Sequence, residues 1–398
     1  MTIASEVYYD PYDVELNSDP YPMFARLRDE SPIYYNEQHD FYAVSRYEDV
    51  NRGIMDHETY SSARGAILEI IKAGIEIPTG TLIFEDPPVH NIHRKLLSRM
   101  FTPRRVTVLE DKIRAFCART LDPLVETGRF DFVTDLGAQI PMRVIGMLMG
   151  VPESEQRGLV DSESTVATEP GRPMTENANG PLATGEGFAA YIDYRVKHPS
   201  DDLMTELMNA EFEDETGTVR RLGREELQMY LTVIATAGSD TVTRFLGWAG
   251  KVLAEHPDQR RELVHDRSLI PQAVEELLRF EPPAPHVARY VTRDVEWHGR
   301  TVPEGAVMMM LIGAANRDSR RFTPDGDVFD IHRAARSHLS FGGGTHFCLG
   351  NSLARLEARV ALDEILNRFP EWDVDLAGAR LSPTSTVRGW ETMPTVVP

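Results

Sequence analysis

The sequence predicts a mainly α-helical protein with small β-sheets, and three observations favour this class. Apolar residues recur three or four positions apart along much of the chain, which is the spacing of one helix face. One such pattern runs without a break from Gly223 to His256, about 34 residues, and as a helix it would span roughly 50 Å. β-type segments are few: a hairpin pattern at 33–47 and short segments in the C-terminal third.

The other elements follow in chain order from proline, glycine and periodicity signals. Residues 19–32 form a short predicted helix closed by a proline, and the hairpin at 33–47 has β-rich residues around a polar break. Two consecutive prolines precede a helical pattern that lasts to about Gly150. After the long helix we expect the following elements: a helix at 270–280, strands within 286–299 and 301–313, and a last helix at 351–369.

The segment from Glu169 to Gly187 is rich in glycine and proline among small polar residues. This composition breaks helices and leaves the backbone free, so we expect a mobile loop. An interdomain linker is the alternative. It is disfavoured because both flanking segments read as helices and no shift in composition separates two halves.

Composition and charge exclude several classes of protein. The 42 Lys and Arg against 62 Asp and Glu give a net charge of −20, which argues against general binding of nucleic acid or of anionic membrane. The two cysteines cannot form a disulfide framework, and a reducing cytosol fits best. The N-terminal segment has no signal-peptide pattern and no apolar membrane span, so we expect a cytoplasmic protein that does not enter a membrane.

The most distinctive segment is a glycine-rich loop from Phe341 to Gly350 that holds Cys348 and runs directly into a helix. The glycines allow the backbone to approach something flat and bulky. Nearby N–H groups and the positive end of the helix favour a thiolate, which is the form that binds a metal. From this segment alone, a buried and inert cysteine is the commoner alternative.

A second segment interrupts the good helix formers of the long helix with Ala237-Gly-Ser-Asp240-Thr241. Glycine beside side chains that compete for backbone hydrogen bonds predicts a local kink or bulge that opens a groove. The alternative is that Asp240 and Thr241 are ordinary polar residues on an exposed face.

These two segments resemble the cytochrome P450 superfamily, whose haem-binding segment has a Phe, two glycines, a basic residue, and a cysteine followed by a small residue. The resemblance extends from residues 19–28 to the last helix and implies a single cytochrome P450 domain over residues 1–398. It implies that Cys348 is the axial thiolate ligand of a haem b iron, with Phe341 packed near it, and that Thr241 and Asp240 serve oxygen activation, Asp240 as a proton relay. The implied activity is insertion of one atom of dioxygen into an organic substrate.

The resemblance also implies roles outside the two motifs. Glu276 and Arg279, three apart on one helix, match a buried structural network whose third member is an arginine upstream of the cysteine loop. Val328 occupies or adjoins the position usual for that arginine, so Arg317 or Arg333 is expected to substitute for it. Four residues match contacts to the haem propionates: His90, Arg94, Arg289 and His346. Without the cofactor, these four would be ordinary surface charges and a helix histidine.

Substrate contacts are less defined by the sequence. By matching position, Ile234, Ala237 and Val287 are predicted to face the distal pocket. The segment 61–85 carries several aliphatic residues that suit an apolar ligand, although an ordinary amphipathic helix packed on the core is an equal alternative. The sequence does not identify the substrate.

No flavin or nicotinamide fingerprint is present, so electrons are expected from a separate ferredoxin and ferredoxin reductase. A basic patch on the cysteine side is predicted as the ferredoxin docking site, formed by Arg355, Arg359, Arg104, Arg105 and Arg114.

We expect a monomer. A peroxide-driven peroxygenase and a haem-thiolate protein that binds a ligand without turnover are the alternatives. Asp240 and Thr241 disfavour both, because neither needs a proton relay from solvent.

Overall fold

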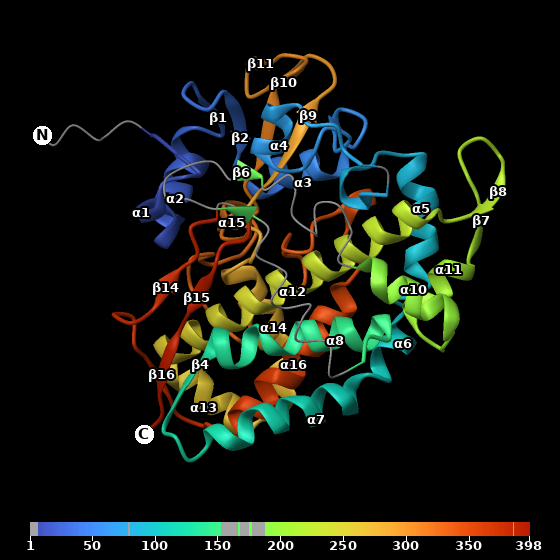
Figure 1. The fold of residues 1–398 in the computed structure, drawn as a ribbon. Helices are drawn as coiled ribbons and strands as arrows, with labels where there is room; N and C mark the ends of the chain where they lie inside the picture. The colour runs from blue at the N-terminus through green and yellow to red at the C-terminus, as the bar shows by residue number, and fades with distance from the viewer. Residues whose placement is uncertain (1–6, 79, 153–165, 168–174, 177–187, 385) are drawn as a thin grey trace, which may run out of the picture.

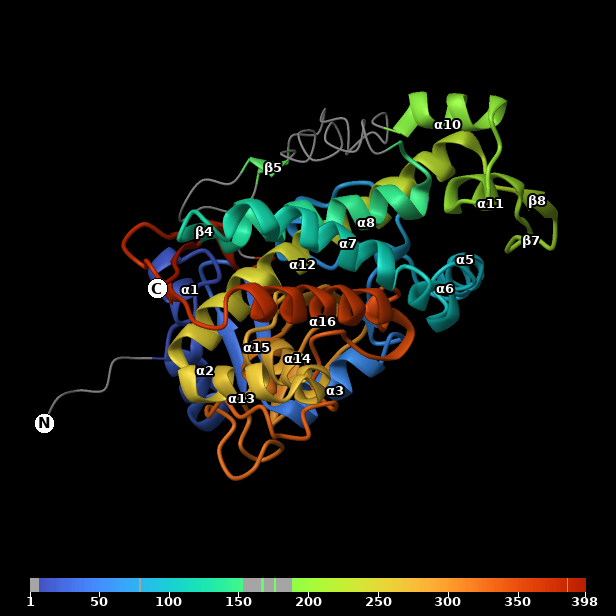
Figure 2. The same ribbon diagram turned by 90° about the horizontal axis from the view of Figure 1, so that it is seen from below.

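The computed structural model describes residues 7–78, 80–152, 166–167, 175–176, 188–384 and 386–398. Helices form most of the molecule, and the larger sheet lies at one side together with the N-terminal helices (Figure 1). The long helix α12, Arg224–Glu255, crosses the molecule from the neighbourhood of α11 to that of α13 (Figures 1 and 2). The predicted class, mainly helical with small sheets, is confirmed.

The helices of the described chain are α1 Val14–Ser18, α2 Tyr21–Glu30, α3 Tyr47–Met55, α4 Leu68–Ala73, α5 Val89–Ser98, α6 Pro103–Thr107, α7 Glu110–Leu121, α8 Gln139–Met149, α10 Ala189–Lys197, α11 Leu203–Asn209, α12, α13 Pro257–His265, α14 Ile270–Phe280, α15 Ile312–Asn316 and α16 Asn351–Arg368. Short helical turns are η1 Leu82–Phe84, η2 Asp122–Leu124, η3 Phe132–Gly137, which is a π-helix, η5 Arg267–Leu269 and η6 Gly344–His346.

The larger sheet has five strands in the order β1-β2-β12-β9-β3, with β12 parallel to β2 and antiparallel to β9. Its strands are β1 Ile33–Asn36, β2 Phe41–Val44, β3 Tyr60–Ser61, β9 Val287–Val291 and β12 Val307–Met310. The small sheets are β4 Arg129–Asp131 with β16 Pro394–Val396 and β13 Asp373–Val374, β5 Val166–Ala167 with β6 Thr175–Glu176, β7 Glu211–Glu213 with β8 Val219–Arg221, β10 Val295–Trp297 with β11 Arg300–Val302, and β14 Arg380–Leu381 with β15 Trp390–Thr392.

The predicted boundaries agree closely with these elements. The long helix has Gly223 and His256 as its caps, α14 spans the predicted 270–280, and α16 ends one residue before the predicted 369. The loop predicted at 169–187 lies outside the described residues, apart from the short strand β6.

The expected kink in α12 is not present, because α-helical hydrogen bonding continues through residues 237–241. The Ser239 and Thr241 hydroxyls donate to the carbonyls of Ala235 and Ala237, at 3.0 and 3.1 Å, without breaking the helix. Gly238 has a different purpose: a Cβ there would lie 2.7 Å from Ile145 Cδ1 of α8. The glycine therefore allows two helices to approach closely and does not bend one.

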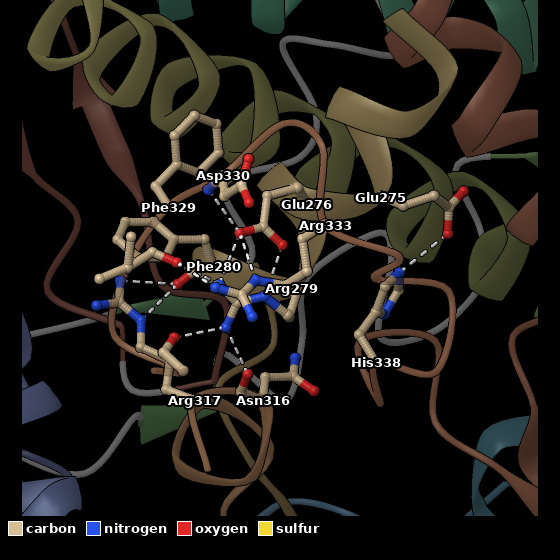
Figure 3. A network of polar contacts seen from close by, with 12 residues as sticks. Glu275, Glu276, Arg279, Phe280, Asn316, Arg317, Phe329, Asp330, Arg333 and His338 are labelled. Atoms are coloured by element: carbon tan, nitrogen blue, oxygen red, sulfur yellow. Dashed lines mark hydrogen bonds and ion pairs between the residues drawn. The ribbon is translucent and has the colours of Figure 1, made fainter. Parts of the chain in front are cut away.

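A buried ion pair joins α14 to the chain that leads to the cysteine loop. Glu276 and Arg279 are fully buried, with Arg279 Nε 2.7 Å from Glu276 Oε2. The Arg279 guanidinium also donates to three backbone carbonyls, those of Asn316, Gly326 and Val328. The three bonds to carbonyls fasten α14 to the segment 316–333, and Figure 3 shows the ion pair within this network.

Arg333 is the third member of this network. Its Nε lies 3.3 Å from Glu276 Oε1, and its Nη2 donates to the Val328 carbonyl, so the backbone of Val328 joins the network although its side chain cannot. The other expected substitute, Arg317, pairs with Glu281 at 3.2 Å. The guanidinium of Arg333 thus replaces the cation that position 328 lacks.

Glu276→Gln is expected to lower the free energy of unfolding by about 3 kcal/mol or more, because it leaves the Arg279 charge buried without a counter-charge. Equilibrium unfolding in urea measures this. Asp258→Asn is the matched control: its partner Arg261 and Asp258 itself are largely exposed, so a loss below about 0.5 kcal/mol is expected. Equal losses in the two variants would contradict a structural role for the buried pair.

Candidate functional site

Cys348 lies near the end of the glycine-rich loop, three residues before the start of α16. Its backbone N–H donates to the Phe341 carbonyl at 2.8 Å, which closes the loop, and its sulfur accepts a hydrogen bond from the Gly350 N–H. Gly342 and Gly344 have φ of +68° and +59°, which favour glycine. The backbone therefore presents one sulfur atom in a fixed position.

The electrostatics of this sulfur differ from the expectation. Burial raises the pKa of the Cys348 thiol above its usual value, and the Gly350 N–H and the positive charges of Arg94 and Arg355 offset this only in part. The loop and the helix end do not favour the thiolate on their own. A metal cation at the sulfur would supply the additional positive charge that stabilises the thiolate, because a coordinated thiol is deprotonated.

Two contacts of the partly buried Arg355 hold the loop in place, and sequence reasoning did not predict them. Arg355 stacks on the ring of Phe341 at 4.3 Å and forms an ion pair with Glu275 of α14, with Nε 2.6 Å from Oε1. Glu275 also accepts from His338 at 3.2 Å (Figure 3). Burial raises the pKa of Glu275, but the hydrogen bonds from His338 and Arg355 outweigh this and bring it to about 2. Glu275 is therefore a permanent anion beneath the loop.

Next to the loop lies a cluster of histidines and arginines that have no carboxylate partner among the described residues, formed by His90, Arg94, Arg289 and His346. His90 and His346 are in ring contact, with centroids 4.3 Å apart, and Arg94 Nη2 donates to the Phe347 carbonyl at 2.5 Å. Burial, followed by the positive charges of Arg289, His90 and Arg94, lowers the pKa of His346 to about 3. Residues from α5, β9 and the cysteine loop thus share one electrostatic environment.

The polar groups of this cluster are not satisfied within the described chain. Neither ring nitrogen of His90 has a hydrogen-bond partner there, and neither does Nε2 of His346. Arg289 is 7% exposed and donates to its neighbour's carbonyl, that of Ala288, and it forms no ion pair within 4 Å with a described residue. Burial, opposed by Asp86, lowers the pKa of Arg289 to about 10. Buried donors and a buried cation without partners fit a ligand that carries carboxylates.

One face of α12 is open near the middle of the helix. Thr236 and Ala237 are exposed in the middle of this otherwise buried helix, and Val233, Asp240 and Thr241 are partly exposed on the same face. The Asp240 carboxyl accepts no hydrogen bond from the part of the chain that the structure describes, and burial raises its pKa, with Arg244 opposing. A free acid and a hydroxyl therefore lie side by side on an open helix face.

The predicted substrate residues lie in different environments. Ala237 is on the open face of α12, Val287 is partly exposed at the start of β9, and Ile234 is buried within the helical core. Val233 and Thr236 were not predicted, although a helical spacing of four back from Ala237 and Asp240 would have identified them.

The aliphatic residues of the segment 61–85 also lie partly in the core and partly at the surface. Leu68 and Ile71 of α4 are buried in the core of the larger sheet, as expected for an amphipathic helix packed on it, whereas Ile75 is exposed.

Comparison with known proteins agrees with this site. The family model described as cytochrome P450 matches residues 186–380. A putative cytochrome P450 123 of Mycobacterium tuberculosis is 37% identical, over 98% of this chain and 96% of the relative, and a steroid C26-monooxygenase of the same species is 35% identical, over 93% and 92%. The solved structure of a cytochrome P450 from Chondromyces apiculatus has a TM-score of 0.85 at 31% identity, covering 98% of each chain.

The fold and its relatives define an oxygen-inserting haem-thiolate enzyme. The chain belongs to the cytochrome P450 family and is a monooxygenase of that family. In the described part of the chain, no helix is long and apolar enough to span a membrane.

Arg289→Gln is expected to speed haem release by at least about tenfold, because a buried carboxylate of the cofactor loses a charged hydrogen-bond donor. Transfer of haem to excess apomyoglobin, followed by absorbance, measures the rate. Arg293→Gln is the matched control four residues further on, since Arg293 bonds to Thr59 and lies outside the cluster. A wild-type rate in both variants would show that Arg289 does not hold the cofactor.

Proposed function

We propose that this protein uses haem b to insert one atom of dioxygen into an apolar small organic molecule, with electrons from a separate ferredoxin and its reductase. One observation carries the proposal: a cysteine on a fixed loop adjoins buried donors that have no acceptor among the described residues. Haem b offers a metal for the sulfur and two carboxylates for the donors.

When bound, haem b supplies the activation of dioxygen. Cys348 would provide the sulfur ligand to its iron, and His90, Arg94, Arg289 and His346 would hold its propionates. The Glu275–Arg355 ion pair and the Arg355–Phe341 stack keep the loop at a constant position. These contacts supply binding and orientation and take no part in bond making.

Thr241 and Asp240 are proposed to deliver protons. In the structure the Thr241 hydroxyl donates to the Ala237 carbonyl, which leaves its oxygen free to accept. By rotation the hydroxyl can give its proton to a group bound at the open face of α12 and take another proton from Asp240. Asp240 suits this exchange because burial raises its pKa from the ordinary aspartate value toward neutrality.

An apolar substrate is supported by the lining and by the relatives. Val233 and Ala237 present apolar groups on the open face of α12, and Thr236 adds a hydroxyl. The relatives include a vitamin D(3) 25-hydroxylase of Pseudonocardia autotrophica, 33% identical over 99% of this chain and 98% of the relative. A Bacillus megaterium relative of known structure, 25% identical with a TM-score of 0.85, was solved in complex with testosterone.

The proposed ferredoxin site differs from the patch predicted from the sequence. Arg105, Arg114, Arg355 and Arg359 each have a carboxylate of this chain within 4 Å: Glu206, Asp363, Glu275 and Glu110 respectively. On or next to α5 and α6, the exposed cations without such a partner among the described residues are Lys95, Arg99 and Arg104. Because Arg94 of α5 contacts the cysteine loop, we propose α5 and α6 as the docking surface for an acidic ferredoxin.

Cys348→Ala is expected to abolish the red-shifted absorbance band that the reduced, carbon monoxide-bound protein gives through its thiolate ligand, together with turnover. Difference spectra measure the band. Cys117→Ala is the matched control, because Cys117 is fully buried on α7 and burial raises its thiol pKa to about 12. Survival of the band in the Cys348 variant would disprove the proposed ligand.

Thr241→Ala is expected to lower turnover with ferredoxin and reduced nicotinamide by about tenfold or more and to divert electrons to peroxide, because proton delivery is impaired. Turnover driven by added hydrogen peroxide needs no such delivery and is expected to change less. Thr243→Ser, which keeps the hydroxyl that donates to Gly137, is the control on the buried face. Equal losses with both oxidants would contradict a role of Thr241 in proton delivery.

A further inference from the structure

Arg244 lies one helical turn after Asp240 on α12, and the mechanism above does not use it. Residues four apart on a helix have Cβ atoms about 6 Å apart and share a face. The Arg244 side chain is partly buried, and its guanidinium is not ion-paired: no carboxylate of the described chain lies within 4 Å of it. A cation in such a position is unusual unless its charge is used.

A backbone contact with strand β15 holds the guanidinium in place. Arg244 Nη1 donates to the carbonyl of Trp390 in strand β15, and Nε is buried without a partner. Gly389 makes room for the stem of the side chain, because a Cβ there would lie 2.5 Å from Arg244 Cβ. One donor is thus satisfied by the C-terminal hairpin, and others remain available.

We propose that Arg244 is a positioning residue for proton delivery, whose fixed positive charge sets the protonation of the Asp240 carboxyl. The inference rests on the proposed function, since it assumes that protons pass through Asp240. Each proton that the carboxylate takes up is passed to the Thr241 hydroxyl, which restores the carboxylate. Arg244 exchanges no proton and acts through its charge.

The electrostatic surroundings of Asp240 support this assignment. Burial raises its pKa, and Arg244 is the charged residue of the described chain that lowers it. The elements packed on α12 include η3, α8 and β15, and their charged side chains have other partners: Asp135 accepts from the Asp131 N–H, Arg143 stacks on Phe116, and Glu391 pairs with Arg380. Glu357 of α16 is fully buried, and burial raises its pKa well above the ordinary glutamate value.

The geometry therefore sets two opposing effects on one carboxyl. A buried acid without a cation would stay protonated and would be a poor proton acceptor. A buried acid in full contact with an arginine would stay ionised and would be a poor donor. At one turn's distance, with the guanidinium held by Trp390, the charge lowers the pKa of the carboxyl against the effect of burial, and this balance favours both uptake and release of a proton.

The test is Arg244→Gln in the holoenzyme, with the protonation of Asp240 followed directly. Infrared difference spectra between acid and neutral pH report buried carboxyl groups, and Asp240→Asn identifies the band. We expect the midpoint of this band to rise by about one pH unit in Arg244→Gln, and the limb of the kcat–pH profile that depends on Asp240 to move up by the same amount. Arg244→Lys keeps the charge and is expected to restore most of the wild-type midpoint.

Lys251→Gln is the matched control, because it removes a cation from the same helix. Lys251 lies about 16 Å from Asp240 along the helix axis, and screening makes its effect on Asp240 small. If Arg244→Gln does not retain haem, Gly389→Ala provides a second route, since its Cβ would lie 2.5 Å from Arg244 Cβ and would move the arginine stem, and with it the guanidinium, from its place beside Trp390. An unmoved midpoint in whichever of these two variants folds would overturn the inference.

The outcomes separate this inference from the proposed function. If Asp240→Asn impairs coupling but the midpoint is the same with and without the Arg244 charge, the relay stands and the role of Arg244 falls. If Asp240→Asn leaves product yield per nicotinamide unchanged, the relay itself is wrong and the role of Arg244 falls with it.

Discussion

The fully buried ion pair of Glu276 and Arg279 is the interaction on which the position of the site depends. It satisfies the Arg279 guanidinium completely, with two carboxylate oxygens and three backbone carbonyls. A charge can be buried without a large penalty when it is satisfied to this extent. The same bonds fix the segment 316–333, and through it the start of the cysteine loop, to the rigid helix α14.

The contrast between Arg279 and Arg289 supports the assignment of the candidate site. Both arginines are buried, but Arg289 has one bond to a carbonyl and no carboxylate within 4 Å in the described chain. The fold gives the Arg279 guanidinium a full set of acceptors. It leaves Arg289 and two histidines without such a set, and this indicates that the second group of donors binds a ligand. The cofactor assignment therefore follows from a comparison within the molecule as well as from its relatives.

Local signals in the sequence were sufficient for the elements and for the cysteine loop. Periodicity located α12 and α14, because their apolar faces repeat without a break, and the glycine pattern located Cys348. The failures are three-dimensional. Gly238 read as a kink, since the sequence does not show that Ile145 of another helix lies against it. The docking arginines read as free cations, since the carboxylates that neutralise Arg105 and Arg355 come from helices distant in sequence.

The close approach at Gly238 also has a consequence for how such a pocket changes during evolution. The spacing between α8 and α12 is limited there by a single hydrogen atom against the Ile145 methyl group. Paired exchanges, a larger residue at 238 with a smaller one at 145, would preserve packing while shifting the helix that carries the reactive face. Residues that do not contact the oxidised compound can thus change the position of the helix face that does.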